Sequence, residues 1–150
     1  MNELLKNTLF WAPLFASMSA QILKVLIILL LDRRFDPDRL TETGGMPSSH
    51  SATVSALATA AGITYGVGSP LFAICMTFGL IVIYDATGVR RAAGRHAEVL
   101  NTLVSELAHL IEDGKRPEVL KTLLGHNYSQ VFVGTLLGVL VGYLTTQAIG

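Results

Sequence analysis

Gly44-Gly45-Met46-Pro47-Ser48-Ser49-His50-Ser51-Ala52 lies between a charged loop and an alanine-rich apolar segment. The two glycines allow a tight bend, and the proline suits the start of a helix. Ser48 is a good N-cap residue, so we expect a helix to begin here. The free amides of its first turn would attract an anion, and His50 lies in the same turn. The stretch therefore predicts an anion site beside a titratable imidazole, which indicates phosphate chemistry.

The composition is that of a membrane protein. Of 150 residues, 51% are hydrophobic, and the mean hydropathy is +0.51. The length indicates a single domain over residues 1–150. Eleven basic and eleven acidic residues cancel, so nothing points to nucleic acid as a partner. Cys75 is the single cysteine and lies in an apolar run, so we interpret it as an inert buried thiol.

Four apolar segments predict an all-α integral membrane protein with four transmembrane helices. The first has 23 residues, and about 20 are enough to cross the hydrocarbon core. The segments are Leu9 to Leu31, Ser49 to Tyr65, Leu71 to Ala86 (continuing toward Arg90 or Arg91) and Tyr128 to Ile149.

An amphipathic cytoplasmic helical segment is predicted between the third and fourth of these helices. Apolar residues recur three and four positions apart from Val99 to Ile111, as they do on one face of a helix. Gly114 and Pro117 mark its end. Glu118 to Leu124 is expected to form one or two further helical turns.

Charge predicts the orientation in the cell (inner) membrane. Nine of the eleven Lys and Arg residues lie in the Arg33–Arg39 and Arg90–Lys121 stretches. By the positive-inside rule both stretches face the cytoplasm, and the termini lie on the opposite side. The side chains that could carry chemistry then converge on the cytoplasmic end of the helices: Lys24, His50, Arg90, Arg91 and His126.

Two ionisable groups in apolar surroundings are candidates for function. Lys24 lies seven residues inside its apolar run, where a charge costs roughly 2.5–3.5 kcal/mol, and snorkelling to the interface is the alternative. Asp85, near the end of the third helix, would orient an arginine or a histidine. A guanidinium suits bidentate binding of phosphate, but the pattern does not choose between Arg90 and Arg91. An interfacial ion pair is the alternative there.

Two imidazoles at one membrane face can divide labour between nucleophile and general acid. His50 and His126 form the preferred pair. His96 is the competing partner, and His109 is interpreted as a solvated surface residue. The histidines are far apart in sequence, so no metal site is predicted.

Small residues recur every four positions on two of the helices, which permits close helix packing. This packing would occur either inside the monomer or between copies in a homo-oligomer. The two stripes are Ala52, Ala56 and Ala60, and Gly134, Gly138 and Gly142.

These motifs, in this order, resemble the divergent branch of the type-2 phosphatidic acid phosphatase superfamily, which is related to bacterial acid phosphatases and vanadium haloperoxidases. The resemblance covers nearly the whole chain. The matching pieces are Lys24, Gly44 to Ala52, Tyr84 to Arg91 with Ala93-Gly94 and Val99-Leu100-Asn101, and Leu123 to His126 followed by Gln130-Val131.

The resemblance implies a lipid-phosphate phosphatase that works through a phosphohistidine, with His126 as nucleophile and His50 as general acid. On the cytoplasmic side, phosphatidylglycerophosphate or phosphatidate is the expected substrate. No cofactor or metal is implied, because fixed cations would stabilise the transition state. A non-catalytic protein that binds or moves a lipid phosphate is the alternative. The implied phosphate ligands are Lys24, Ser48, Ser49, and Arg90 or Arg91.

The last motif departs from the superfamily's pattern. Gln130 stands where the superfamily has an aspartate, four residues after the histidine. The arginine that should precede the histidine by six residues precedes His96 instead, as Arg90. We therefore keep His96 as the alternative nucleophile, and we hypothesise that Asp85 supplies the missing carboxylate.

Overall fold

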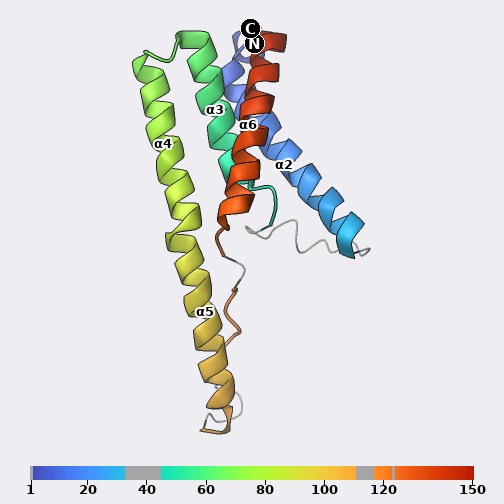
Figure 1. The fold of residues 1–150 in the computed structure, drawn as a ribbon, viewed down its shortest axis with the longest axis vertical. Coiled ribbons are helices and arrows are strands. Elements are labelled where there is room, and N and C mark those ends of the chain that lie inside the picture. The colour runs from blue at the N-terminus through green and yellow to red at the C-terminus, as the bar shows by residue number, and fades with distance from the viewer. Residues whose placement is uncertain (1, 33–44, 111–116, 123) are drawn as a thin grey trace.

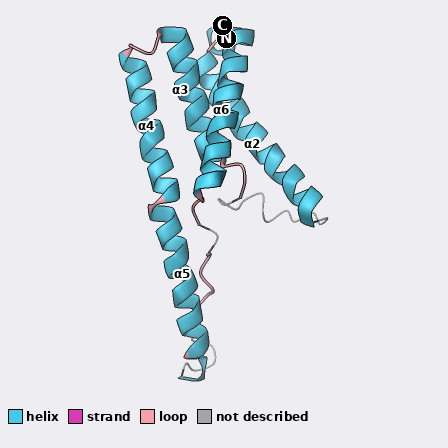
Figure 2. Ribbon diagram, in the orientation of Figure 1, coloured by secondary structure: helices cyan, strands magenta, loops and turns pink. Residues whose placement is uncertain are grey.

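The structure is a computed structural model that describes residues 2–32, 45–110, 117–122 and 124–150. Within these ranges all regular structure is helical, which confirms the all-α class (Figure 2). In chain order the helices are α1 (Asn2–Leu5), α2 (Thr8–Asp32), α3 (Ser49–Tyr65), α4 (Pro70–Thr87), α5 (Val89–Glu106), the 3-10 helix η2 (Ala108–Leu110) and α6 (Tyr128–Ile149).

Local sequence explains where the long helices begin. Ser69 caps α4 by accepting a hydrogen bond from the Phe72 amide, and Pro70 occupies the first turn. Asn127 caps α6 through a reciprocal pair of hydrogen bonds with Gln130. α2, α3, α4 and α6 all begin and end within one residue of the predicted apolar segments.

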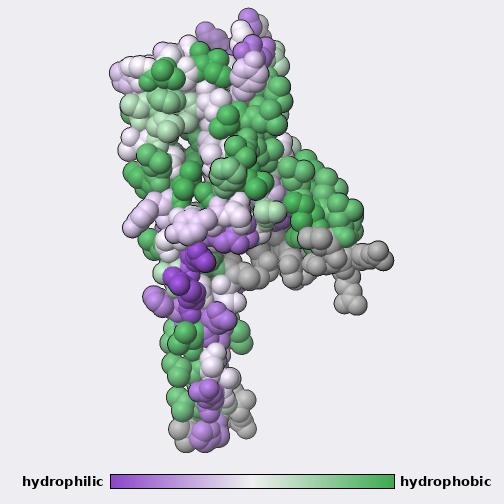
Figure 3. Space-filling model, in the orientation of Figure 1, coloured by the Kyte–Doolittle hydropathy of each residue, from purple (hydrophilic) through white to green (hydrophobic). Residues whose placement is uncertain are grey.

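Three stretches of the described chain are long and apolar enough to cross a membrane, namely Thr8–Leu30, Pro70–Glu106 and Tyr128–Ile149. Apolar side chains cover much of the body that these helices form (Figure 3). α3 has only 17 residues and packs against α2, α4 and α6. α4 and α5 form one long column interrupted at Gly88, so the helical path continues well past Arg91 (Figure 1).

The small-residue stripes of α3 and α6 meet each other inside one chain. A Cβ atom added at Gly134, Gly138 or Gly142 would lie 2.4, 2.3 or 2.8 Å from a backbone carbonyl oxygen of α3 or its cap. Backbones this close tolerate only glycine, which explains the four-residue repeat. Fully buried alanines of α2 and α3 form the neighbouring layer: Ala12, Ala16, Ala20, Ala52, Ala56 and Ala60. Both stripes are therefore used within the monomer, and a homo-oligomer stays a prediction.

Residues 117–122, which lie between α5 and α6 in the chain, are not helical, so the prediction of extra turns after Pro117 was wrong for them. The Asn101 side chain on α5 donates to the Leu120 carbonyl and accepts from the Leu120 amide, each at 2.9 Å. A Cβ at Gly94 would lie 2.6 Å from the Thr122 carbonyl oxygen, so this glycine lets the segment approach α5. The backbone is thus satisfied by a side chain of α5, and a helical turn would remove that pairing.

Candidate functional site

A cavity of about 270 Å³ is lined by residues from four parts of the chain. These parts lie where α3 and α6 begin and α4 ends, at the ends of these helices remote from the two chain termini (Figure 1). The cavity walls come from the first turn of α3, the last turns of α4, the start of α5 and the residues before α6. They are formed by His50, Ile81, Val82, Asp85, Ala86, Arg90, Gly125 and His126. Four residues predicted as functional, from three separate parts of the sequence, therefore share one cavity: His50, Asp85, Arg90 and His126.

Lys24 continues the buried face of α2. It follows Ala12, Ala16 and Ala20 at the same four-residue spacing and is only 2% exposed. A Cβ at Gly45, where φ is +97°, would lie 3.3 Å from the Lys24 Cδ atom. The lysine side chain therefore runs past the backbone of the glycine-rich stretch, and its burial disfavours snorkelling along a lipid-facing surface.

Ser48 is fully buried and is occupied with building the start of α3. Its Oγ atom accepts hydrogen bonds from the Ser51 amide at 3.3 Å and the Ser51 hydroxyl at 3.0 Å. Its own amide donates to the Gln130 carbonyl at 3.1 Å, which ties α3 to α6. Ser49 is half-buried in the same turn. Neither Ser48 nor Ser49 is among the residues that line the cavity.

His126 is fixed by its backbone and by one ring nitrogen. Its amide donates to the Ala86 carbonyl of α4 at 2.9 Å. The preceding Gly125 has φ +79°, and a Cβ there would lie 2.5 Å from the Arg91 amide nitrogen, so only glycine fits. The ring Nδ1 lies 3.2 Å from the Gln130 Oε1 atom. This short segment places the His126 imidazole against the end of α4.

The other ring nitrogen of His126 has no hydrogen-bond partner within the described part of the chain. His126 is 3% exposed, and its Nε2 atom is buried. The ring centroids of His50 and His126 are 6.1 Å apart, and His50 is exposed. A buried imidazole with an unused nitrogen therefore faces a cavity that holds a second, accessible imidazole.

The environment of His126 favours its neutral form. Burial lowers the pKa of His126, and the positive charges of His50, Lys24 and Arg90 lower it further, whereas the hydrogen bond to Gln130 raises it. The net direction is downward from the ordinary pKa of histidine. The shift favours the uncharged imidazole at neutral pH, which is the state that a nucleophile needs.

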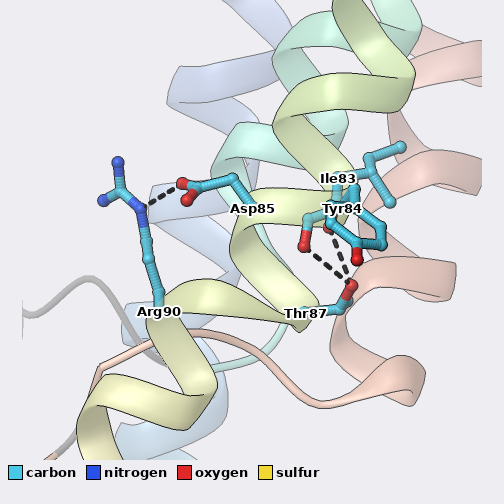
Figure 4. A network of polar contacts seen from close by, with 5 residues as sticks. All are labelled: Ile83, Tyr84, Asp85, Thr87 and Arg90. Carbon is cyan, nitrogen blue, oxygen red and sulfur yellow. Dashed lines mark hydrogen bonds and ion pairs between the residues drawn. The ribbon is translucent and has the colours of Figure 1, made fainter.

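The neighbouring arginines point to different partners. Arg90 forms an ion pair with Asp85, with Nε and Oδ2 2.5 Å apart, and both residues line the cavity (Figure 4). The Arg91 guanidinium lies 5.7 Å from the ring centroid of Tyr128 at the start of α6. Asp85 was expected to supply the missing carboxylate to a histidine, but it contacts Arg90. The Nδ1 atom of His126, where such a carboxylate would bind, contacts Gln130 instead.

The remaining predicted residues lie elsewhere. His96 is exposed on α5 and does not line the cavity, and His109 is exposed near Glu106. Among the described residues, no group of three or more His, Cys, Asp or Glu side chains could hold a metal ion. Sequence reasoning missed Ser51, although its position three residues after the cap was a usable signal. It also missed Tyr128 as the partner of Arg91, for which no signal existed.

Known proteins resemble this chain over a range that includes all residues of the cavity. A family model described as "Divergent PAP2 family" matches residues 5–141. The chain is 42% identical over 148 residues to "Uncharacterized membrane protein YuiD" of Bacillus subtilis (strain 168), across 93% of this chain and 94% of that protein. No solved structure matches the chain.

Proposed function

The chain belongs to the divergent PAP2 family, and from that premise we propose that it is a membrane phosphatase acting on a lipid phosphomonoester, either phosphatidylglycerophosphate or phosphatidate. The observation that carries the proposal is the pairing of His50 with His126, whose ring centroids lie 6.1 Å apart in one cavity with Arg90. Two imidazoles and a guanidinium at the end of a helix bundle suit phosphoryl transfer at a membrane boundary.

The proposed reaction has two steps. In the first, the Nε2 lone pair of His126 attacks phosphorus, the bond from phosphorus to the lipid oxygen breaks, and His50 in its imidazolium form gives a proton to the departing alkoxide and becomes neutral. In the second, His50 takes a proton from water, the hydroxide attacks the phosphohistidine, and the bond from phosphorus to nitrogen breaks. The products are the lipid alcohol and inorganic phosphate, and both histidines return to their starting states.

Fixed cations and amides would stabilise the charge that develops on the phosphoryl oxygens. Arg90 lines the cavity, and the buried Lys24 lies against Gly45 just before the start of α3. We assign these two cations, together with Ser49 and the first amides of α3, to phosphate binding. The groups of Ser48 are engaged with Ser51 and Gln130, so its proposed contribution is to shape the helix start.

We also propose that α3 is a fourth transmembrane helix. With α3 counted, the chain crosses the membrane an even number of times, which agrees with the two termini lying at one end (Figure 1). The positive-inside rule then puts the cavity on the cytoplasmic side of the inner membrane. α5 extends beyond the body as the proposed amphipathic cytoplasmic segment, with Val99, Leu100 and Leu103 exposed.

A non-catalytic role in lipid-phosphate binding or transport is the second candidate. It is favoured by one observation: the amide of Gln130, and not a carboxylate, contacts the His126 ring. A neutral partner cannot stabilise an imidazolium by charge. Turnover therefore decides between the two candidates.

Fast turnover is expected to depend on His50. In detergent with a chelator present, the protein is expected to release phosphate from phosphatidylglycerophosphate or phosphatidate, and His50→Ala is expected to lower kcat by about 100-fold to 10,000-fold. An aryl phosphate should restore much of the His50→Ala rate, because its leaving group needs no proton. His109→Ala, a change at an exposed histidine outside the cavity, is the control.

Two results would contradict this prediction in different ways. Binding of lipid phosphate without any turnover would favour the non-catalytic candidate. Activity that disappears on chelation would overturn metal independence while leaving the phosphatase assignment in place.

The two neighbouring arginines are expected to contribute unequally to turnover. Arg90→Gln is expected to reduce kcat/KM by about 100-fold to 1,000-fold, because it removes a cation from the cavity wall. Arg91→Gln is expected to change kcat/KM by less than about 10-fold, since its cation–π contact with Tyr128 has a modest energy. The measurement is phosphate release at several substrate concentrations. A larger loss for Arg91→Gln would reverse the assignment.

A further inference from the structure

One oxygen atom of Gln130 serves both the cap of α6 and the ring of His126. The Gln130 Oε1 atom accepts a hydrogen bond from the Asn127 amide at 3.1 Å. In return, the Gln130 amide donates to the Asn127 side chain at 3.0 Å, which completes a capping box. The same Oε1 atom lies 3.2 Å from the Nδ1 atom of His126.

The cap of α6 determines the orientation of the Gln130 side-chain carboxamide, that is, where its oxygen atom and its NH₂ group lie. This orientation in turn determines the tautomer of His126. The atom that receives the Asn127 N–H must be the carboxamide oxygen, because the NH₂ group could not accept it. An oxygen cannot donate to Nδ1, so Nδ1 must carry the hydrogen. A neutral imidazole carries one ring hydrogen, which leaves the lone pair on Nε2. That atom is buried, and no described residue hydrogen-bonds to it.

We propose that Gln130 is a positioning residue that holds His126 in the Nδ1–H tautomer, so that the cap of α6 presets the Nε2 lone pair for attack on phosphorus. The catalytic half of this inference rests on the proposed function, whereas the tautomer does not. The start of α6 and the attacking nitrogen thereby become one structural unit.

A neutral partner suits the charges that surround this ring. The charges that act on it come from His50 of α3, Lys24 of α2 and Arg90 of α5. Asp85 of α4 lines the same cavity as His50 and Arg90. The one carboxylate of this set is already paired with Arg90. A carboxylate at position 130 would favour a charged imidazolium, whose Nε2 has no lone pair to offer. The amide fixes the ring without adding that charge.

Two substitutions separate acceptor geometry from charge. Gln130→Glu retains an oxygen acceptor and a capping box, since glutamate also serves at this helix position, but it adds a negative charge. Gln130→Met keeps the length of the side chain and removes the acceptor. Gln147→Glu makes the same change at an exposed position in the last turn of α6 and is the matched control.

The tautomer is read directly by nitrogen NMR of the ¹⁵N-histidine-labelled protein in detergent, with His126→Ala identifying the signals. Wild type and Gln147→Glu are expected to show the hydrogen on Nδ1, and Gln130→Met is expected to lose this single tautomer. A wild-type ring with its hydrogen on Nε2 would overturn the inference. An unchanged tautomer in a folded Gln130→Met protein would also overturn it.

The pH dependence of kcat/KM is a second measurement of this contact. It would not change on substitution if Gln130 had only a structural role. Activity needs neutral His126, so it falls as the pH drops through the pKa of this ring. The added carboxylate of Gln130→Glu should raise that pKa and move the acidic limb of kcat/KM upward by about 1 pH unit or more. An unmoved limb would contradict a contact between residue 130 and the nucleophile. If no substrate is turned over, NMR still decides the tautomer, so failure of the proposed function remains distinguishable.

Discussion

His126→Ala is expected to reduce phosphate release by at least about 1,000-fold, because it removes the atom that forms the covalent bond to phosphorus. His96→Ala is expected to leave the rate within about threefold, as for a surface change away from the site. The structural reason is placement: His126 is buried in the cavity wall, whereas His96 is exposed on α5 and outside it. Phosphate release from the same lipid phosphate measures both variants.

Trapping the phosphohistidine intermediate tests the choice between His126 and His96 without relying on the overall rate of phosphate release. Rapid acid-free quenching with a labelled lipid phosphate should leave label on wild type and on His96→Ala, and none on His126→Ala. Activity that survives His126→Ala and disappears in His96→Ala would reverse the choice of nucleophile. It would also mean that the arginine at the six-residue spacing before His96 marks the functional motif.

The helices were predictable because their signals are local. Apolar length set the extents of α2 and α6, and cap residues such as Ser48 and Ser69 set where α3 and α4 begin. The small-residue stripes predicted close packing, but they could not say what each would meet. The choice between a partner helix and a second copy depends on the folded path of the chain, and the structure brings the two stripes together.

The finer geometry of the site depends on contacts between residues distant in sequence. No local sequence pattern predicts that the Asn101 side chain pairs with the backbone of Leu120, 19 positions away. This pairing is the reason given above for the non-helical path of residues 117–122. Arg90 and Arg91 differ in direction simply because successive residues of a helix lie about 100° apart. That Arg91 meets Tyr128, however, depends on where the folded chain places the start of α6. The sequence could name the residues of the cavity, but it could not say how they pair.

Gly138→Ala is expected to lower the thermal unfolding midpoint in detergent, although alanine is the better helix former by about 1 kcal/mol. The added Cβ would lie 2.3 Å from the Ala52 carbonyl oxygen and 2.9 Å from the Ala52 Cα atom. Backbone atoms cannot swing aside as a side chain can, so α6 must move away from α3. Overpacking of this kind costs about 1–3 kcal/mol, which exceeds the gain in helix propensity over most of that range.

Gly68→Ala is the matched control for this prediction, because the same methyl group there would meet nothing within 4 Å. Its midpoint should stay close to wild type, since surface changes usually alter stability by less than about 0.5 kcal/mol. The contact between α3 and α6 also positions the two histidines of the site. His50 lies in the first turn of α3, and His126 directly precedes the cap of α6. Displacing one helix from the other should therefore reduce phosphate release even below the unfolding midpoint. An unchanged midpoint in Gly138→Ala would mean that α3 and α6 are not in backbone contact, and the distance between the two imidazoles would lose its structural basis.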